Sequence, residues 1–213
     1  MPCALHILNA DGALNTWTDR IQQAFDQSLL LVSNRIPVGN VDVVVYNDAE
    51  YVVPDLGLGG FCTSPRRLYL PLDVNHIDLP AHFEIRFQNF LAHELHHCAR
   101  RRIAGYADTL AQALVTEGLA CCFEEELPGG STPMYATRVT GTELARVHQL
   151  ALPALHEPLA GWAEWFFGER EPDIPMHAGY CLGYSLVSGW LQRTGATASA
   201  AYAVSAADVW AEA

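Results

Sequence analysis

The first 80 residues of the chain combine short apolar runs with one amphipathic segment. Residues 4–9 are apolar, and residues 41–46 are rich in valine. Both runs predict β-strands, because β-branched and other apolar side chains pack well on a pleated surface. Apolar residues within 16–34 recur at spacings of three and four, which predicts a helix. Residues 67–72 predict another strand, which we place at a sheet edge because Pro71 cannot donate a ladder hydrogen bond.

From about residue 81 the hydrophobic pattern becomes helical. It predicts helices over residues 82–102, 108–126, 138–150, 158–168, 176–193 and 198–212. The expected fold class is therefore α+β. Residues 1–80 would form a small α/β part with a mixed sheet and an edge strand, and residues 81–213 a mainly helical part. A length of 213 residues predicts that both parts pack as a single domain.

Composition narrows the classes of function. The formal net charge is −12, which argues against nucleic acid or an anionic membrane as a partner. All twelve basic residues are arginines, so Schiff-base lysine chemistry and a P-loop lysine are both excluded. No apolar run is long enough for a membrane helix, and the start of the chain lacks the pattern of a signal peptide.

The six cysteines are scattered along the chain, and no CxxC pair occurs. This spacing indicates free, mostly buried thiols in a reducing compartment. Cys98 is expected to point away from the neighbouring His97. We therefore expect a cytoplasmic protein and no cysteine nucleophile.

The most informative segment is His-Glu-x-x-His at residues 93–97. On a helix, His93 and His97 lie one turn apart on the same face, where both imidazoles can reach one metal ion. Glu94 lies about 100° further round the helix, where it can contact a water molecule at the metal. An apolar stripe on the other side of this helix predicts that the helix is wedged into the protein; it comprises Phe83, Phe87, Leu91, Leu95 and Cys98. His96 could replace one of these ligands, because it lies three residues after His93, but it is expected instead to support the ligands from outside or to lie at the surface.

A catalytic zinc site needs a third protein ligand. Glu117 is the candidate, because it is the only charged residue between Asp108 and Glu124 and a buried carboxylate requires a cation. The following residue, Gly118, would let this helix approach the His-Glu-x-x-His helix closely. The alternative is that Glu117 pairs with an arginine, for which Arg100 and Arg101 are nearest.

These motifs together resemble those of known zinc metallopeptidases. His93-Glu-Leu-His-His97 followed by Glu117-Gly-Leu-Ala resembles the gluzincin branch, in which two histidines and a glutamate on the next helix bind zinc. A narrower resemblance, over roughly residues 57–190, is to a bacterial domain-of-unknown-function family described as predicted zinc-dependent proteases. It rests further on the segments 59–64, 72–73, 165–168 and 179–184 and on Arg100. The resemblance implies a zincin-like fold, one Zn²⁺ per chain and an edge strand at residues 67–72 that binds an extended peptide.

The segment around residue 180 offers candidates for oxyanion stabilisation. Tyr180 and Tyr184 lie one helical turn apart, and either hydroxyl could stabilise a tetrahedral intermediate; His177 is a rival. The alternative is that both tyrosines are core residues. Gly179 and Gly183, which are also one turn apart, predict a close helix crossing.

Our leading hypothesis is a zinc-dependent hydrolase, and specifically a peptidase that acts on peptides or proteins. His93, His97 and Glu117 would bind Zn²⁺, and Glu94 would act as the general base. Two alternatives remain: a non-catalytic adaptor that uses zinc as a folding element, and a metal-free helical protein with a chance motif. The sequence does not determine the substrate or the oligomeric state.

Overall fold

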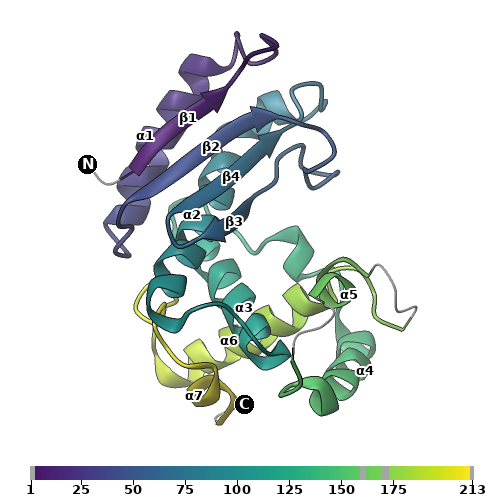
Figure 1. The fold of residues 1–213 in the computed structure, drawn as a ribbon. Coiled ribbons are helices and arrows are strands. Elements are labelled where there is room, and N and C mark those ends of the chain that lie inside the picture. Colours follow the sequence, from purple (N-terminus) through teal and green to yellow (C-terminus); the bar gives the residue numbers. More distant parts are fainter. Residues whose placement is uncertain (1–2, 159–161, 169–172, 212–213) are drawn as a thin grey trace. The chain divides into compact units, whose positions relative to one another are not determined.

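The computed structural model describes residues 3–158, 162–168 and 173–211, and its chain forms two compact units (Figure 1). The first unit contains residues 1–103 and 127–130, and the second contains residues 104–126 and 131–213. The chain therefore passes between the units three times. The two units are described separately below.

The first unit is built on a mixed four-stranded sheet with the strand order β1-β2-β4-β3. The strands are β1 (Cys3–Leu8), β2 (Val41–Asn47), β3 (Phe61–Ser64) and β4 (Arg67–Leu72). β1, β2 and β4 are parallel, whereas β3 is antiparallel to β4. The parallel pair β1-β2 needs a crossover connection, which helix α1 (Thr18–Ser33) supplies. The expected α+β class, with a mixed sheet and a helical second half, is confirmed.

Helices α1 and α2 (Leu79–Ala104) lie on the same side of this sheet (Figure 1). Alternate residues of β2 are buried, as expected for a strand with one covered face, whereas the last three residues of β4 are all buried. The apolar stripe predicted for α2 is also confirmed, because all five of its side chains are fully buried: Phe83, Phe87, Leu91, Leu95 and Cys98. This packing fixes the helix that carries His-Glu-x-x-His.

One strand prediction was wrong in its place in the sheet. Residues 67–72 form β4, which is paired on both sides, and the edge strand next to it is β3. The carbonyl of Pro71 accepts a hydrogen bond from the N–H of Gly59, at 3.0 Å. The N–H and C=O groups of a strand residue point to the same side, so the N–H that proline lacks would also face the Gly59 segment, beyond the end of β3. Its absence therefore costs no hydrogen bond to β2.

The second unit is helical in its described residues. It comprises α3 (Leu110–Glu126), the short 3₁₀ turn Met134–Ala136, α4 (Gly141–Ala151), a second such turn at Leu152–Ala154, α5 (Trp162–Phe167), α6 (Ala178–Thr194) and α7 (Ala206–Ala211). The predicted helix over 198–212 was too long at its start, because residues 198–203 form turns and the helix begins only at Ala206. Residues 159–161 and 212 of the predicted helices lie outside the described residues.

Close contact between α3 and α6 organises this unit. A Cβ atom on Gly118 would overlap the carbonyl oxygen of Gly183, and a Cβ on Gly183 would overlap that of Leu114. The predicted close crossing at Gly183 is thereby confirmed. The partner expected for Gly118 was wrong, since the approach that this glycine permits is to α6. Gly179 makes similar room for the ring of Phe166, which lies 2.6 Å from a Cβ at that position.

Candidate metal centre and its surroundings

Helix α2 brings His93, Glu94 and His97 together in the first unit. One ligand-type atom from each residue lies within 4.8 Å of the others. The two imidazole rings are 4.6 Å apart between centroids and nearly perpendicular, at 86°. Each of the three side chains is 4% exposed. Two imidazoles and a carboxylate are a donor set that zinc accepts, so these residues could hold a metal ion.

The backbone of the first unit approaches Glu94 at one particular residue. A Cβ atom on Gly60, immediately before β3, would lie 2.9 Å from both Cγ and Oε1 of Glu94. Phe90, one turn before Glu94, would be 3.2 Å from the same Cβ. Only glycine therefore fits here without a shift of the Glu94 side chain. Sequence reasoning used Gly60 as part of a family motif and did not connect it with Glu94.

Two further polar residues of α2 are buried beside this turn. His96 is fully buried, so the prediction that it might be a surface residue was wrong. Arg100 is 3% exposed, and burial lowers its pKa to about 10. The guanidinium nevertheless remains protonated at neutral pH. A buried positive charge thus follows the second histidine by three residues.

Glu117 lies on α3 in the second unit, where its side chain is 6% exposed. A carboxylate that is so far removed from water needs a cation or strong hydrogen-bond donors. Its assignment as the third metal ligand stays a prediction, as does the alternative of an arginine partner.

The candidates for oxyanion stabilisation differ in their surroundings within the second unit. Tyr180 packs against Tyr135 and Phe166, with ring centroids 4.9 Å apart in each case, and its ring lies 6.0 Å from that of His177. Tyr184 instead donates a hydrogen bond to Glu125, at 2.9 Å. The structure therefore brings Tyr180 and His177 together and gives the Tyr184 hydroxyl a different partner.

His177 has an unusual backbone conformation. It precedes α6 with φ = 69°, which is the one positive φ at a non-glycine residue in the described part of the chain. A left-handed histidine costs about 1 kcal/mol or more, and such residues are enriched at functional sites. Nothing in the sequence indicated this conformation.

A buried acid that sequence reasoning did not single out lies on the same helix as Glu117. Glu124 is 3% exposed and accepts a hydrogen bond of 2.6 Å from the hydroxyl of Tyr135. Burial and the nearby carboxylate raise the pKa of Tyr135 well above its ordinary value. Unlike Glu117, which stands alone in an apolar stretch, Glu124 begins a run of three glutamates, so the sequence pattern contained no comparable signal for it.

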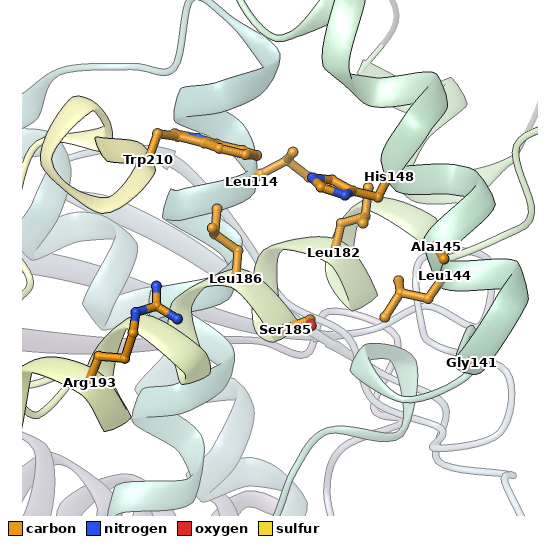
Figure 2. A pocket seen from close by; sticks show the side chains of 10 residues that line it. All are labelled: Leu114, Gly141, Leu144, Ala145, His148, Leu182, Ser185, Leu186, Arg193 and Trp210. Carbon is orange, nitrogen blue, oxygen red and sulfur yellow. The ribbon is translucent and has the colours of Figure 1, made fainter. Parts of the chain in front are cut away.

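A separate cavity of about 390 Å³ lies within the second unit (Figure 2). Its lining is mostly apolar, from α3, α4, α6 and α7, and Leu114, Leu182, Leu186 and Trp210 are among its side chains. Arg193 and His148 are also part of its lining. None of the residues predicted for the metal site or the oxyanion lines this cavity.

The fold and this donor set define an α+β protein with a candidate His-Glu-His metal site. The chain belongs to the family described as "Predicted Zn-dependent protease (DUF2268)", whose model matches residues 18–211. No curated protein and no solved structure matches the chain. In the described residues, no helix combines the length and the apolar character needed to cross a membrane.

Proposed function

We propose that this chain is a zinc-dependent peptidase of the gluzincin type that binds one Zn²⁺ ion per chain. The observation that carries the proposal is the buried turn of α2, on which His93, Glu94 and His97 present donor atoms within 4.8 Å of one another. Membership of a family described as zinc-dependent proteases supports the same interpretation.

Three side chains would hold the ion. His93 and His97 would bind through neutral imidazole nitrogens, which are good zinc ligands. Glu117 would supply a carboxylate oxygen, and its burial supports this role because an ionised carboxylate removed from water needs a nearby cation. Pairing of Glu117 with Arg100 or Arg101 is the competing explanation.

A bound Zn²⁺ ion supplies Lewis acidity, which lowers the pKa of water and polarises the scissile carbonyl. Glu94 accepts a proton from the attacking water and then delivers it to the nitrogen of the leaving amine. Burial of Glu94 suits this proton transfer. A carboxylate held away from bulk water keeps one orientation, and few solvent molecules compete for its proton. Tyr180, Tyr184 or His177 would stabilise the developing oxyanion by donating a hydrogen bond.

The substrate would be a peptide or protein segment in an extended conformation. β3 is the edge strand on the side of the sheet nearest to Gly60 and hence to Glu94. Strand addition at an edge uses backbone hydrogen bonds and therefore accepts many sequences. This role passes to β3 from residues 67–72, which are internal. The free cysteines favour the reducing cytoplasm as the compartment.

The decisive experiment measures metal content by elemental mass spectrometry on untagged protein. We expect about one zinc per chain in the wild type and much less in His93→Ala and Glu117→Ala. His82→Ala is the matched control, because this exposed histidine lies on the same helix. Absence of zinc after reloading with excess metal would overturn the proposal.

The role of Glu94 needs a separate test. Glu94→Gln should retain zinc and lose hydrolysis of a peptide library, since the amide cannot accept the proton. Glu84→Gln, an exposed change on the same helix, should leave hydrolysis unchanged. Undiminished hydrolysis in Glu94→Gln would remove Glu94 from the mechanism.

The second candidate is a zinc-stabilised adaptor without catalysis. It predicts that chelation unfolds the protein, because a structural zinc contributes directly to folding. The peptidase predicts a chelated protein that stays folded, since both units have apolar cores built from their own residues.

A further inference from the structure

Two cysteine thiols meet in the first unit, 36 residues apart in sequence. The Sγ atoms of Cys62, on β3, and Cys98, on α2, are 3.3 Å apart, at hydrogen-bonding distance. Both sulfurs also lie near the carbonyl oxygen of Ser64, at 3.0 Å from Cys62 and 3.6 Å from Cys98. Both cysteines are free. The pair is therefore a reduced dithiol held by a shared acceptor.

The fold explains why these side chains face each other. Cys62 pairs with Leu68 of β4, whose side chain is fully buried. Residues opposite each other in a sheet point to the same face, so Cys62 also points towards the covered face. Cys98 belongs to the fully buried apolar stripe of α2. An irregularity in the ladder between Cys62 and Ser64 bends the edge strand at this point.

The two thiols are not equivalent. Cys62 is half-buried at the sheet edge, whereas Cys98 is fully buried. The guanidinium of Arg101 donates a hydrogen bond to the carbonyl of Cys62 and brings a positive charge close to this thiol. The hydrogen bond from Cys98 and the charge of Arg101 lower the pKa of Cys62 to about 7. A reachable thiol beside a second, buried thiol is the arrangement of redox-sensitive cysteine pairs.

We propose that Cys62 and Cys98 form an oxidation site that closes to a reversible disulfide in the presence of a peroxide. The sulfur of Cys62 attacks one peroxide oxygen, the O–O bond breaks, and Cys62 becomes a sulfenic acid with release of water. Cys98 then attacks the Cys62 sulfur, and the S–O bond breaks. The departing hydroxide takes the thiol proton of Cys98 and leaves as a second water. Peroxide is reduced, the two thiols are oxidised, and a dithiol reductant reverses the step.

The disulfide would tie the edge strand to the helix that carries His93, Glu94 and His97. It would close a loop of 36 residues, and a cross-link of this length stabilises chiefly by restricting the unfolded chain. The site goes beyond the proposed function, because it requires neither zinc nor hydrolysis. Failure of the oxidation site in the test below would leave the peptidase proposal untouched. Failure of the peptidase proposal would likewise leave the oxidation site untouched.

The test treats zinc-free wild-type protein with hydrogen peroxide, then unfolds it and labels it with a maleimide. Six labels are expected before treatment and four after it, with full recovery on reduction. Peptide mapping should find residues 62 and 98 joined in the unlabelled fraction. The unfolding midpoint of the oxidised protein should rise by roughly 5 °C or more. Six labels after treatment, or a disulfide between other cysteines, would overturn the proposal.

Variants then assign the order of events. Cys98→Ser should stop at the Cys62 sulfenic acid, which a dimedone probe traps, and should form no disulfide. Cys62→Ser should react with peroxide at least tenfold more slowly and give no trapped product at position 98. Cys3→Ser, a half-buried cysteine on β1 of the same unit, should behave as the wild type. Equal trapping in the Cys62 and Cys98 variants would contradict the proposed order.

Discussion

Gly60 lies directly against Glu94, so that a Cβ atom on the glycine would stand 2.9 Å from both Cγ and Oε1 of the glutamate. The obstacle is a flexible carboxylate side chain, which can swing away. Gly60→Ala should therefore displace Glu94 with little effect on stability. We expect hydrolysis to fall by about 10²-fold while zinc content stays at the wild-type level, because small misplacements of a catalytic group are costly. Rates and metal content, measured on the same preparations, check this.

Wild-type hydrolysis in Gly60→Ala would show that the position of Glu94 is not set by this contact. Loss of zinc together with hydrolysis would point instead to disruption of the whole turn.

The crossing of α3 and α6 predicts a large stability effect at Gly118. A methyl group there would overlap the backbone carbonyl of Gly183, which cannot rotate away. Gly118→Ala should lower the free energy of unfolding by about 2–3 kcal/mol, the upper range for overpacking. Denaturant titration measures the change.

Gly189→Ala is the control, because Gly189 lies on α6, the other helix of this crossing, but a Cβ there would meet only the guanidinium end of Arg193, at 3.3 Å. This change should be neutral or stabilising by up to about 1 kcal/mol, as expected from helix propensity. Similar losses in both variants would refute the close crossing.

Tyr184→Phe separates the structural and catalytic roles considered for this tyrosine. Its hydroxyl donates to Glu125 at 2.9 Å, and Thr132 bonds to the same carboxylate. Loss of this hydrogen bond to a charged acceptor should lower the free energy of unfolding by about 1–2 kcal/mol. We expect the turnover rate of this variant to stay within about threefold of the wild-type rate. A roughly hundredfold or larger loss of turnover, without a change in stability, would favour the oxyanion role.

The ion pair between Arg20 and Glu84 predicts a pH dependence. Arg20 donates two hydrogen bonds to the carboxylate of Glu84, at 2.5 and 2.7 Å. These bonds lower the pKa of Glu84, so its contribution to stability is complete above the unfolded pKa of about 4.3. The contribution is lost as the pH falls through the lower pKa of the folded state. Because Glu84 is 55% exposed, we expect less than about 1 kcal/mol.

Glu84→Gln tests this by denaturant titration across pH. The variant should be slightly less stable than the wild type at pH 7, and the difference should vanish in acid. A difference that grows on acidification would contradict the sign of the pKa shift.

Features that depend on residues close together in the sequence were predictable from it. The turn with His93 and His97 follows from helical spacing alone, and the buried stripe of α2 follows from the same periodicity. β3 was missed because its four residues follow two glycines and carry no alternating pattern. The contacts from Gly60 to Glu94 and from Cys62 to Cys98 join segments 34 and 36 residues apart, which no local pattern encodes.

The overlong prediction for residues 198–212 has a similar cause. Alanine favours a helix there, but Glu126 of α3 accepts hydrogen bonds from the backbone N–H groups of Ala198 and Ser199. Ser205 then caps α7 through a bond from the N–H of Asp208, at 3.1 Å. A distant carboxylate thus holds these residues in turns.

The interleaving of the two units along the chain limits how this architecture can be divided or exchanged. Residues 127–130 belong to the first unit, although α3 of the second unit separates them from its other segment. Within the first unit, Gln88 donates to the carbonyl of Pro128 at 3.0 Å. A gene fragment that ends after residue 103 would encode an incomplete module. Recombination that exchanged the N-terminal or the C-terminal half of the gene between relatives would separate segments of the same unit. The two units are therefore expected to be inherited together.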